Sequence, residues 1–159
     1  MRFIFLIFIC LCAFSCVKRQ SKDPVPFIEY KNFIPKHTAQ NDSAYMSISY
    51  TDGDGDIFRD KNTDGPNLIG IIYIYDPISK TFQRPYSPIT QDSTGVIGIA
   101  ITQPGDGYKG KSVSGDIIWP MSEYRPNTLS DTVFFYKIFM QDMKGNKSNV
   151  VTTPIFKVK

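Results

Sequence analysis

The stretch TDGDGDIFRDKNTDGPN, residues 51 to 67, concentrates aspartate and glycine between two apolar segments. Calcium binds about six to eight oxygen ligands, mainly carboxylates, amides and backbone carbonyls. Asp52, Asp54 and Asp56 alternate with glycines, so their side chains can turn toward one point on a tightly bent backbone. Without a cation, carboxylates at this spacing would repel one another. The spacing therefore predicts a calcium site, with these three aspartates as its best ligands.

A second half-motif follows in the same stretch, with oxygen-bearing side chains at Asp60, Asn62 and Asp64. This spacing opens the calcium loop of helix-loop-helix proteins. Neither run completes that motif, because Thr63 and Ile71 stand where its glutamate belongs and the flanking segments are strand-like. We therefore keep these three residues as further candidate ligands without the motif. The alternative is a solvated turn, since Asp, Gly and Asn are common turn formers.

The N-terminus predicts export. Residues 1–15 combine a basic start with an apolar run, which is typical of a signal peptide. The run is shorter than the roughly 20 apolar residues of a membrane-spanning helix. The sequence CAFSC resembles a bacterial lipobox and makes Cys16 the expected lipidation site; an ordinary signal peptide is the alternative. All three cysteines lie at or before position 16, so no internal disulfide is expected in the mature chain.

The rest of the chain divides into a lipidated flexible tether, residues 16–26, and one domain, residues 27–159. Alternation of apolar and polar residues, as at Met46, Ile48 and Tyr50, indicates strands with one buried face. The strand-like segments are FIEYKNFI, AYMSISYT, NLIGIIYIY, GVIGIAIT, SVSGDIIW, DTVFFYKIFM and NVVTTPIFKV, with a shorter one at 81–84. We predict an all-β, immunoglobulin-like antiparallel sandwich of about seven strands without a long helix.

This fold would place a second polar loop close to the acidic stretch of residues 51–67. In such a sandwich, the loops after the second and sixth strands lie at the same end. The later loop, QDMKGNKSN, follows a strand whose expected buried face is Phe134, Tyr136, Ile138 and Met140. Asp142 is therefore a further candidate ligand, and a metal held by both loops would have a structural role.

The composition argues against an enzyme or a nucleic-acid-binding protein. The net charge is only +3, and no basic run is interleaved with aromatic residues. The only histidine, His37, lies in an expected turn, and no Gly-x-Ser-x-Gly elbow is present. A hydrolase with paired carboxylates would need the groups that calcium would occupy. We expect no catalytic residues.

Binding is the favoured class of function. Tyr86, Tyr108 and Tyr124 fall in or beside irregular stretches where aromatic rings could contact a glycan, peptide or protein, whereas Trp119 is expected in the core. The alternative is a structural accessory subunit of an outer-membrane complex without a soluble ligand. An aromatic-lined groove would favour the first function, and an apolar patch on one sheet face would favour the second.

SISYTDGDGDI together with YKIFMQDMKGNKSNVVTTP resembles a group of small lipoproteins of the Bacteroidetes with immunoglobulin-like or cadherin-like domains. The resemblance covers most of the mature chain and implies an outer-membrane location without catalytic residues. Surface-displayed members of such groups often carry acidic residues soon after the lipidated cysteine. Lys18 and Arg19 stand there in this chain, which favours an orientation toward the periplasm.

Overall fold

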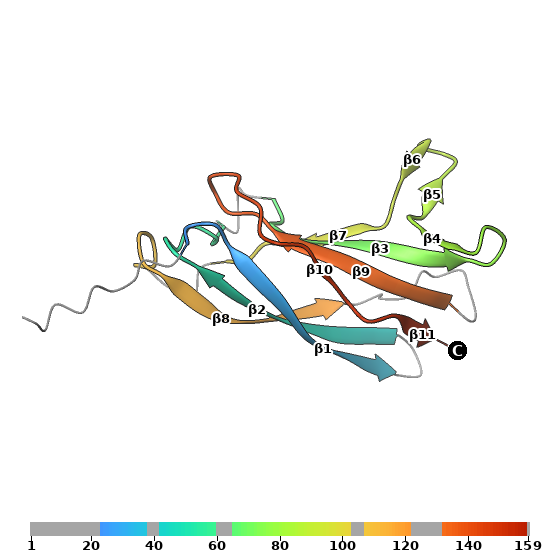
Figure 1. The fold of residues 1–159 in the computed structure, drawn as a ribbon, viewed down its shortest axis with the longest axis horizontal. Coiled ribbons are helices and arrows are strands. Elements are labelled where there is room, and N and C mark those ends of the chain that lie inside the picture. The colour runs from blue at the N-terminus through green and yellow to red at the C-terminus, as the bar shows by residue number, and fades with distance from the viewer. Residues whose placement is uncertain (1–22, 38–41, 60–64, 103–106, 122–131, 159) are drawn as a thin grey trace, which may run out of the picture.

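The described part of the chain is all-β. The computed structural model describes residues 23–37, 42–59, 65–102, 107–121 and 132–158, which form antiparallel sheets and include no helix (Figure 1). Within these ranges there is accordingly no helical segment of the length and apolarity needed to cross a membrane. The predicted signal peptide and Cys16 lie outside the described residues.

The first sheet has three strands, ordered β1-β2-β8. Their bounds are β1 Phe27–His37, β2 Asp42–Asp52 and β8 Val113–Met121. Alternate residues of β2, including Met46 and Ile48, are fully buried, as the period-two pattern predicts. A shift in register between Tyr30 and Asn32 bends β1 against β2.

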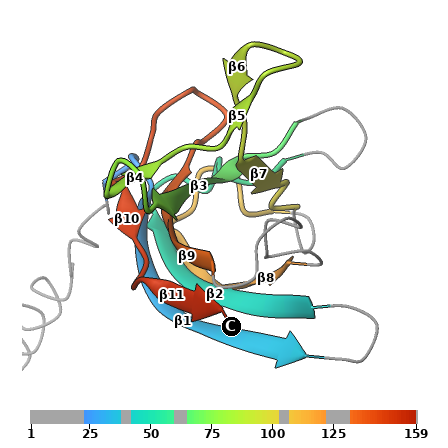
Figure 2. The same ribbon diagram turned by 90° about the vertical axis from the view of Figure 1, so that its right-hand side faces the viewer.

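The second sheet is built around β9 and β3, ordered β10-β9-β3-β4, with β11 also paired to β9 and β7 to β3. Its strands are β3 Leu68–Asp76, β4 Thr81–Gln83, β7 Val96–Ile99, β9 Thr132–Met140, β10 Val151–Thr152 and β11 Phe156–Val158. Figure 2 shows the two sheets as facing layers, so the fold is sandwich-like.

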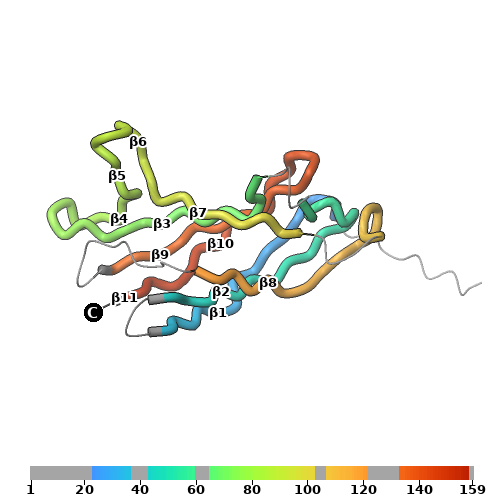
Figure 3. Tube along the Cα trace, turned by 180° about the vertical axis from the view of Figure 1, so that it is seen from behind, coloured from blue at the N-terminus to red at the C-terminus, as the bar shows by residue number. Residues whose placement is uncertain are grey.

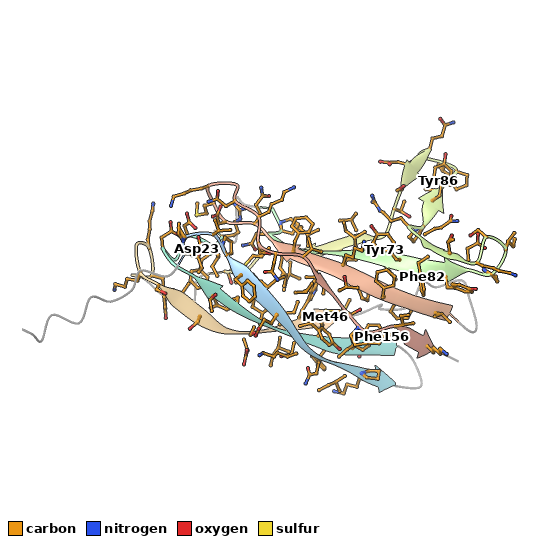
Figure 4. The ribbon with its side chains drawn as sticks, viewed as in Figure 1. Asp23, Met46, Tyr73, Phe82, Tyr86 and Phe156 are labelled. Carbon is orange, nitrogen blue, oxygen red and sulfur yellow. The ribbon has the colours of Figure 1, made fainter. Side chains whose placement is uncertain are left out.

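The core lies between these layers. The four β9 residues predicted to face inward are buried: Phe134, Tyr136, Ile138 and Met140. Figure 4 shows Met46 entering the same space from the first sheet. Trp119, which is 3% exposed, also lies there, and a Cβ at Gly70 would be only 3.0 Å from its ring. The absence of a side chain at residue 70 therefore makes room for the indole.

Each of the seven predicted segments contains a strand, and the short segment at 81–84 contains β4. The last segment is divided into β10 and β11 around Pro154, which cannot donate a backbone hydrogen bond.

One hairpin was not predicted. It consists of β5 Tyr86–Ser87 and β6 Asp92–Ser93 and projects from the second sheet as an arm (Figures 1 and 3). Pro26, the last residue of the predicted tether, directly precedes β1 and is fully buried.

Candidate metal centre

Three loops meet at the end of the sandwich where β2 ends and β8 begins, which we call the acidic pole: residues 52–59, 107–112 and 141–149 (Figures 1 and 3). The Met143 N–H donates to the Asp56 carbonyl at 3.0 Å, and the Gly110 N–H donates to the Asp54 carbonyl at 2.6 Å. The prediction that the acidic loop meets the loop after β9 is therefore confirmed. The participation of residues 107–112 was not predicted.

Asp52, Asp54 and Asp56 converge at this pole. One carboxylate oxygen from each lies within 4.8 Å of the other two. Asp52 is 1% exposed and Asp56 is 7% exposed, although each carries an ionisable group. Buried carboxylates are normally compensated by hydrogen bonds or by a cation.

Hydrogen bonds compensate this cluster only in part. Asp52 Oδ2 accepts from the Asp56 N–H at 3.1 Å, and Asp54 Oδ2 accepts from Lys144 Nζ. Lys144 Nζ also lies 3.1 Å from Asp56 Oδ2, close enough for an ion pair but without hydrogen-bond geometry. The Oδ1 atoms of all three aspartates are buried and accept no hydrogen bond from the described residues.

The pKa values of the cluster reflect this incomplete compensation. Burial, followed by the charge of Asp54, raises the pKa of Asp52 to about 6. Burial also raises the pKa of Asp56, whereas the hydrogen bond from Lys144 lowers that of Asp54. Near neutral pH the metal-free protein therefore holds negative charge in positions that disfavour it.

Gly55 allows the backbone to bend between the ligand candidates. Its φ is +70°, a conformation that non-glycine residues rarely adopt. A Cβ at this position would overlap the carbonyl oxygens of Tyr108 and Lys111. Glycine is thus needed both for the turn and for the close approach of the third loop.

The two apolar residues after Asp56 fix the loop to the core. Ile57 is fully buried and Phe58 is 9% exposed. The Phe58 ring contacts Tyr50 and Tyr108, with centroids 6.5 Å and 5.4 Å away. Ile57 and Phe58 therefore hold the acidic loop against the core.

Asn67 is a structural residue of the pole that sequence reasoning missed. It is fully buried; its Oδ1 accepts from the Ile101 N–H at 2.7 Å, and its Nδ2 donates to the Ile57 carbonyl. Its own carbonyl accepts from the Gln141 N–H at 2.8 Å. One side chain thereby connects the acidic loop to the segment after β7. The sequence placed it only at the start of the strand-like segment NLIGIIYIY and gave it no role at the pole.

Asp142 lies beside the cluster but is used by its own turn. Its two carboxylate oxygens accept from the backbone N–H and side-chain amide of Asn146, at 2.8 and 2.7 Å. Further along the same turn, the Asn149 side chain accepts from the Ile28 N–H at 2.8 Å and donates to the Ile28 carbonyl at 2.9 Å. The Asp-x-x-Gly-Asn-x-Ser-Asn run therefore organises the backbone and joins the loop to β1.

Asp60, Asn62, Asp64 and Tyr124 lie outside the described residues. His37 is the last residue of β1, paired with Asp42. Tyr86 is 62% exposed on the arm, and Tyr108 lies at the acidic pole.

No family model, curated protein or solved structure matches this chain.

Proposed function

We propose that this protein is a non-catalytic binding module of the bacterial cell envelope, with a structural calcium ion at its acidic pole. In this proposal the domain is an immunoglobulin-like sandwich and Cys16 carries a lipid. The protein is anchored in the outer membrane, and its domain faces the periplasm. The signal-peptide pattern and the lipobox-like sequence support the anchor. A glycan, peptide or protein is the proposed class of partner.

Asp52, Asp54 and Asp56 each have a buried Oδ1 atom that has no partner within the described ranges, and these atoms carry the calcium part of the proposal. A buried acceptor without a partner costs about 1–3 kcal/mol, and more when it is charged. One cation would satisfy all three atoms at once. One carboxylate oxygen from each aspartate lies within 4.8 Å of the other two, and this spacing is compatible with calcium, because two oxygens on opposite sides of the ion at about 2.4 Å are about 4.8 Å apart.

The proposed role of calcium is structural. All three carboxylates belong to the loop after β2, which is already hydrogen-bonded to the two other loops of the pole. An ion that fixes this loop would also limit the movement of its neighbours, so the pole would present a rigid surface to a partner. The chain offers little for catalysis, because His37 is its only histidine and its cysteines all precede the domain.

Calcium is expected to raise the melting temperature of chelator-treated protein by about 5–10 °C at 100 times its Kd, since this concentration adds about 2.7 kcal/mol. The measurement is calorimetric titration with thermal melting at pH 7.5, above the pKa of Asp52. The Asp52→Asn, Asp54→Asn, Asp56→Asn variant should not respond to calcium. Without calcium this variant should melt no lower than the parent, because it removes buried charge.

Two results would oppose the calcium site. One is the absence of both heat and a melting shift in the parent protein at several millimolar calcium. The other is a calcium response of the same size in the triple variant. Either result would mean that the acidic loop is a turn without a specific calcium site.

A second function, the accessory subunit, is supported by an aromatic patch on the outer face of the second sheet. The patch consists of Tyr73, Tyr75, Phe82 and Phe135. Tyr73 and Phe135 are stacked across β3 and β9 with centroids 5.1 Å apart, and Phe82 lies 5.0 Å from Phe135. Figure 4 shows Tyr73 and Phe82 on the side away from the first sheet. Apolar side chains on an outer face are typical of contact surfaces.

If this patch holds the protein in a complex, the Tyr75→Ser, Phe82→Ser variant should separate from a larger assembly. The measurement is the native size of the detergent-extracted protein, after melting has shown that the variant is folded. Ile118→Ser is the matched control, because Ile118 is 66% exposed on the first sheet. A monomeric parent protein, or equal dissociation of the control, would exclude this function.

A further inference from the structure

Lys144 extends from the loop after β9 to the aspartates of the acidic loop. Its Nζ contacts Asp54 Oδ2 and lies 3.1 Å from Asp56 Oδ2. The ammonium group thereby places one positive charge beside two of the three carboxylates that are proposed to bind calcium. It makes no hydrogen bond to Asp52, whose Oδ1 has no partner among the described residues.

The contact between the two loops does not depend on this side chain. The backbone hydrogen bond from Met143 N–H to the Asp56 carbonyl connects them directly. Asp142 holds the turn that carries Lys144 through its bonds to Asn146. The Lys144 side chain is itself 61% exposed, so it can leave the carboxylates while the backbone of the pole stays in place.

A metal ion and the ammonium group would compete at this position. Calcium bound by Asp54 and Asp56 would lie within a few ångströms of Nζ, and like charges at this separation repel each other. The lysine side chain is flexible and carries one positive charge that water solvates readily. Calcium carries two positive charges and is coordinated by several oxygens at once. The exchange of one for the other would leave Lys144 in solvent.

We propose that Lys144 is an internal counter-ion that occupies the site in the metal-free protein, lowers its affinity for calcium and is released when calcium binds. This inference rests on the proposed calcium site. The loaded pole then differs from the metal-free pole in two respects: the three carboxylates are held by one ion, and a free ammonium group is presented to solvent beside the exposed Met143.

The test compares calcium affinities by calorimetry for the parent protein, Lys144→Met and Lys147→Met. Lys144→Met should bind calcium about tenfold more tightly, equivalent to about 1.4 kcal/mol. Lys147 is the matched control, because it belongs to the same loop but its Nζ lies over the Phe139 ring, 5.4 Å from the centroid. Its replacement should change the affinity less than about twofold, or 0.4 kcal/mol.

A second measurement follows Lys144 directly. The NMR signal of its ammonium group, assigned with the Lys144→Met variant, should lose protection from solvent exchange as calcium is added. Equal or weaker calcium binding by Lys144→Met would overturn the inference while leaving the calcium site intact. If the Lys144→Met variant binds calcium and the parent protein does not, the inference is supported, because Lys144 would then block the site in the parent protein. Failure of both proteins to bind calcium would overturn both proposals.

Discussion

Replacing Asn67 by alanine is expected to lower the free energy of unfolding by about 2–6 kcal/mol. The substitution removes the partners of two backbone groups, the Ile101 N–H and the Ile57 carbonyl, in a fully buried position. Each unsatisfied group costs about 1–3 kcal/mol. Because Ile57 follows the proposed ligands directly, the calcium-dependent rise in melting temperature should also decrease.

Urea denaturation of the metal-free protein measures the first effect, and melting with and without calcium measures the second. Asn32→Ala is the control, because this asparagine is exposed on β1 and its loss should change stability by less than about 0.5 kcal/mol. A loss below about 1 kcal/mol for Asn67→Ala would mean that water or a shifted backbone replaces the amide.

Replacing Trp119 by alanine is expected to cost about 3–5 kcal/mol, the range for large aromatic residues in cores. The indole is 3% exposed between the sheets, and its ring lies against Gly70, where a Cβ would be only 3.0 Å away. The backbone of the two paired sheets cannot collapse into the volume of the indole, so a cavity would remain.

Trp119 is the only tryptophan of the chain, so its fluorescence reports on its own environment. We expect blue-shifted emission from the folded protein and a large red shift in urea. Ile118→Ala is the control, because the neighbouring side chain is 66% exposed and should matter little. Red-shifted emission from the native state, with a small stability loss in Trp119→Ala, would place the ring in a solvent-exposed platform instead.

The strands and their buried faces could be predicted because their signal is local. The alternation of apolar and polar residues in AYMSISYT and in the strand from 132 to 140 predicts that Met46, Ile48 and Phe134 face the core, and all three are buried. The meeting of the two polar loops also followed, because strand order in a sandwich determines which loops share an end. In contrast, the arm between β4 and β7 has strands of two residues each, too short to show a period.

The polar residues that complete the pole could not be predicted in the same way. Lys144 meets Asp54 across 90 residues of sequence, and Asn67 connects segments that have no common pattern. Lysine in a glycine-containing turn is usually a solvated side chain, and asparagine before a strand usually makes a turn. Only the three-dimensional approach of the loops gives these two residues their partners.

The pair between Asn149 and Ile28 bears on the order in which the protein can fold. The two residues are 121 positions apart, and the side-chain amide of one supplies both hydrogen bonds to the backbone of the other. A chain made from its N-terminus can pair β1 with β2 early, but this contact has to wait until almost the whole domain has been synthesised. Until then, the start of β1 lacks its partner from the other sheet. The turn that carries Asn149 therefore completes the contact between the two sheets at this end.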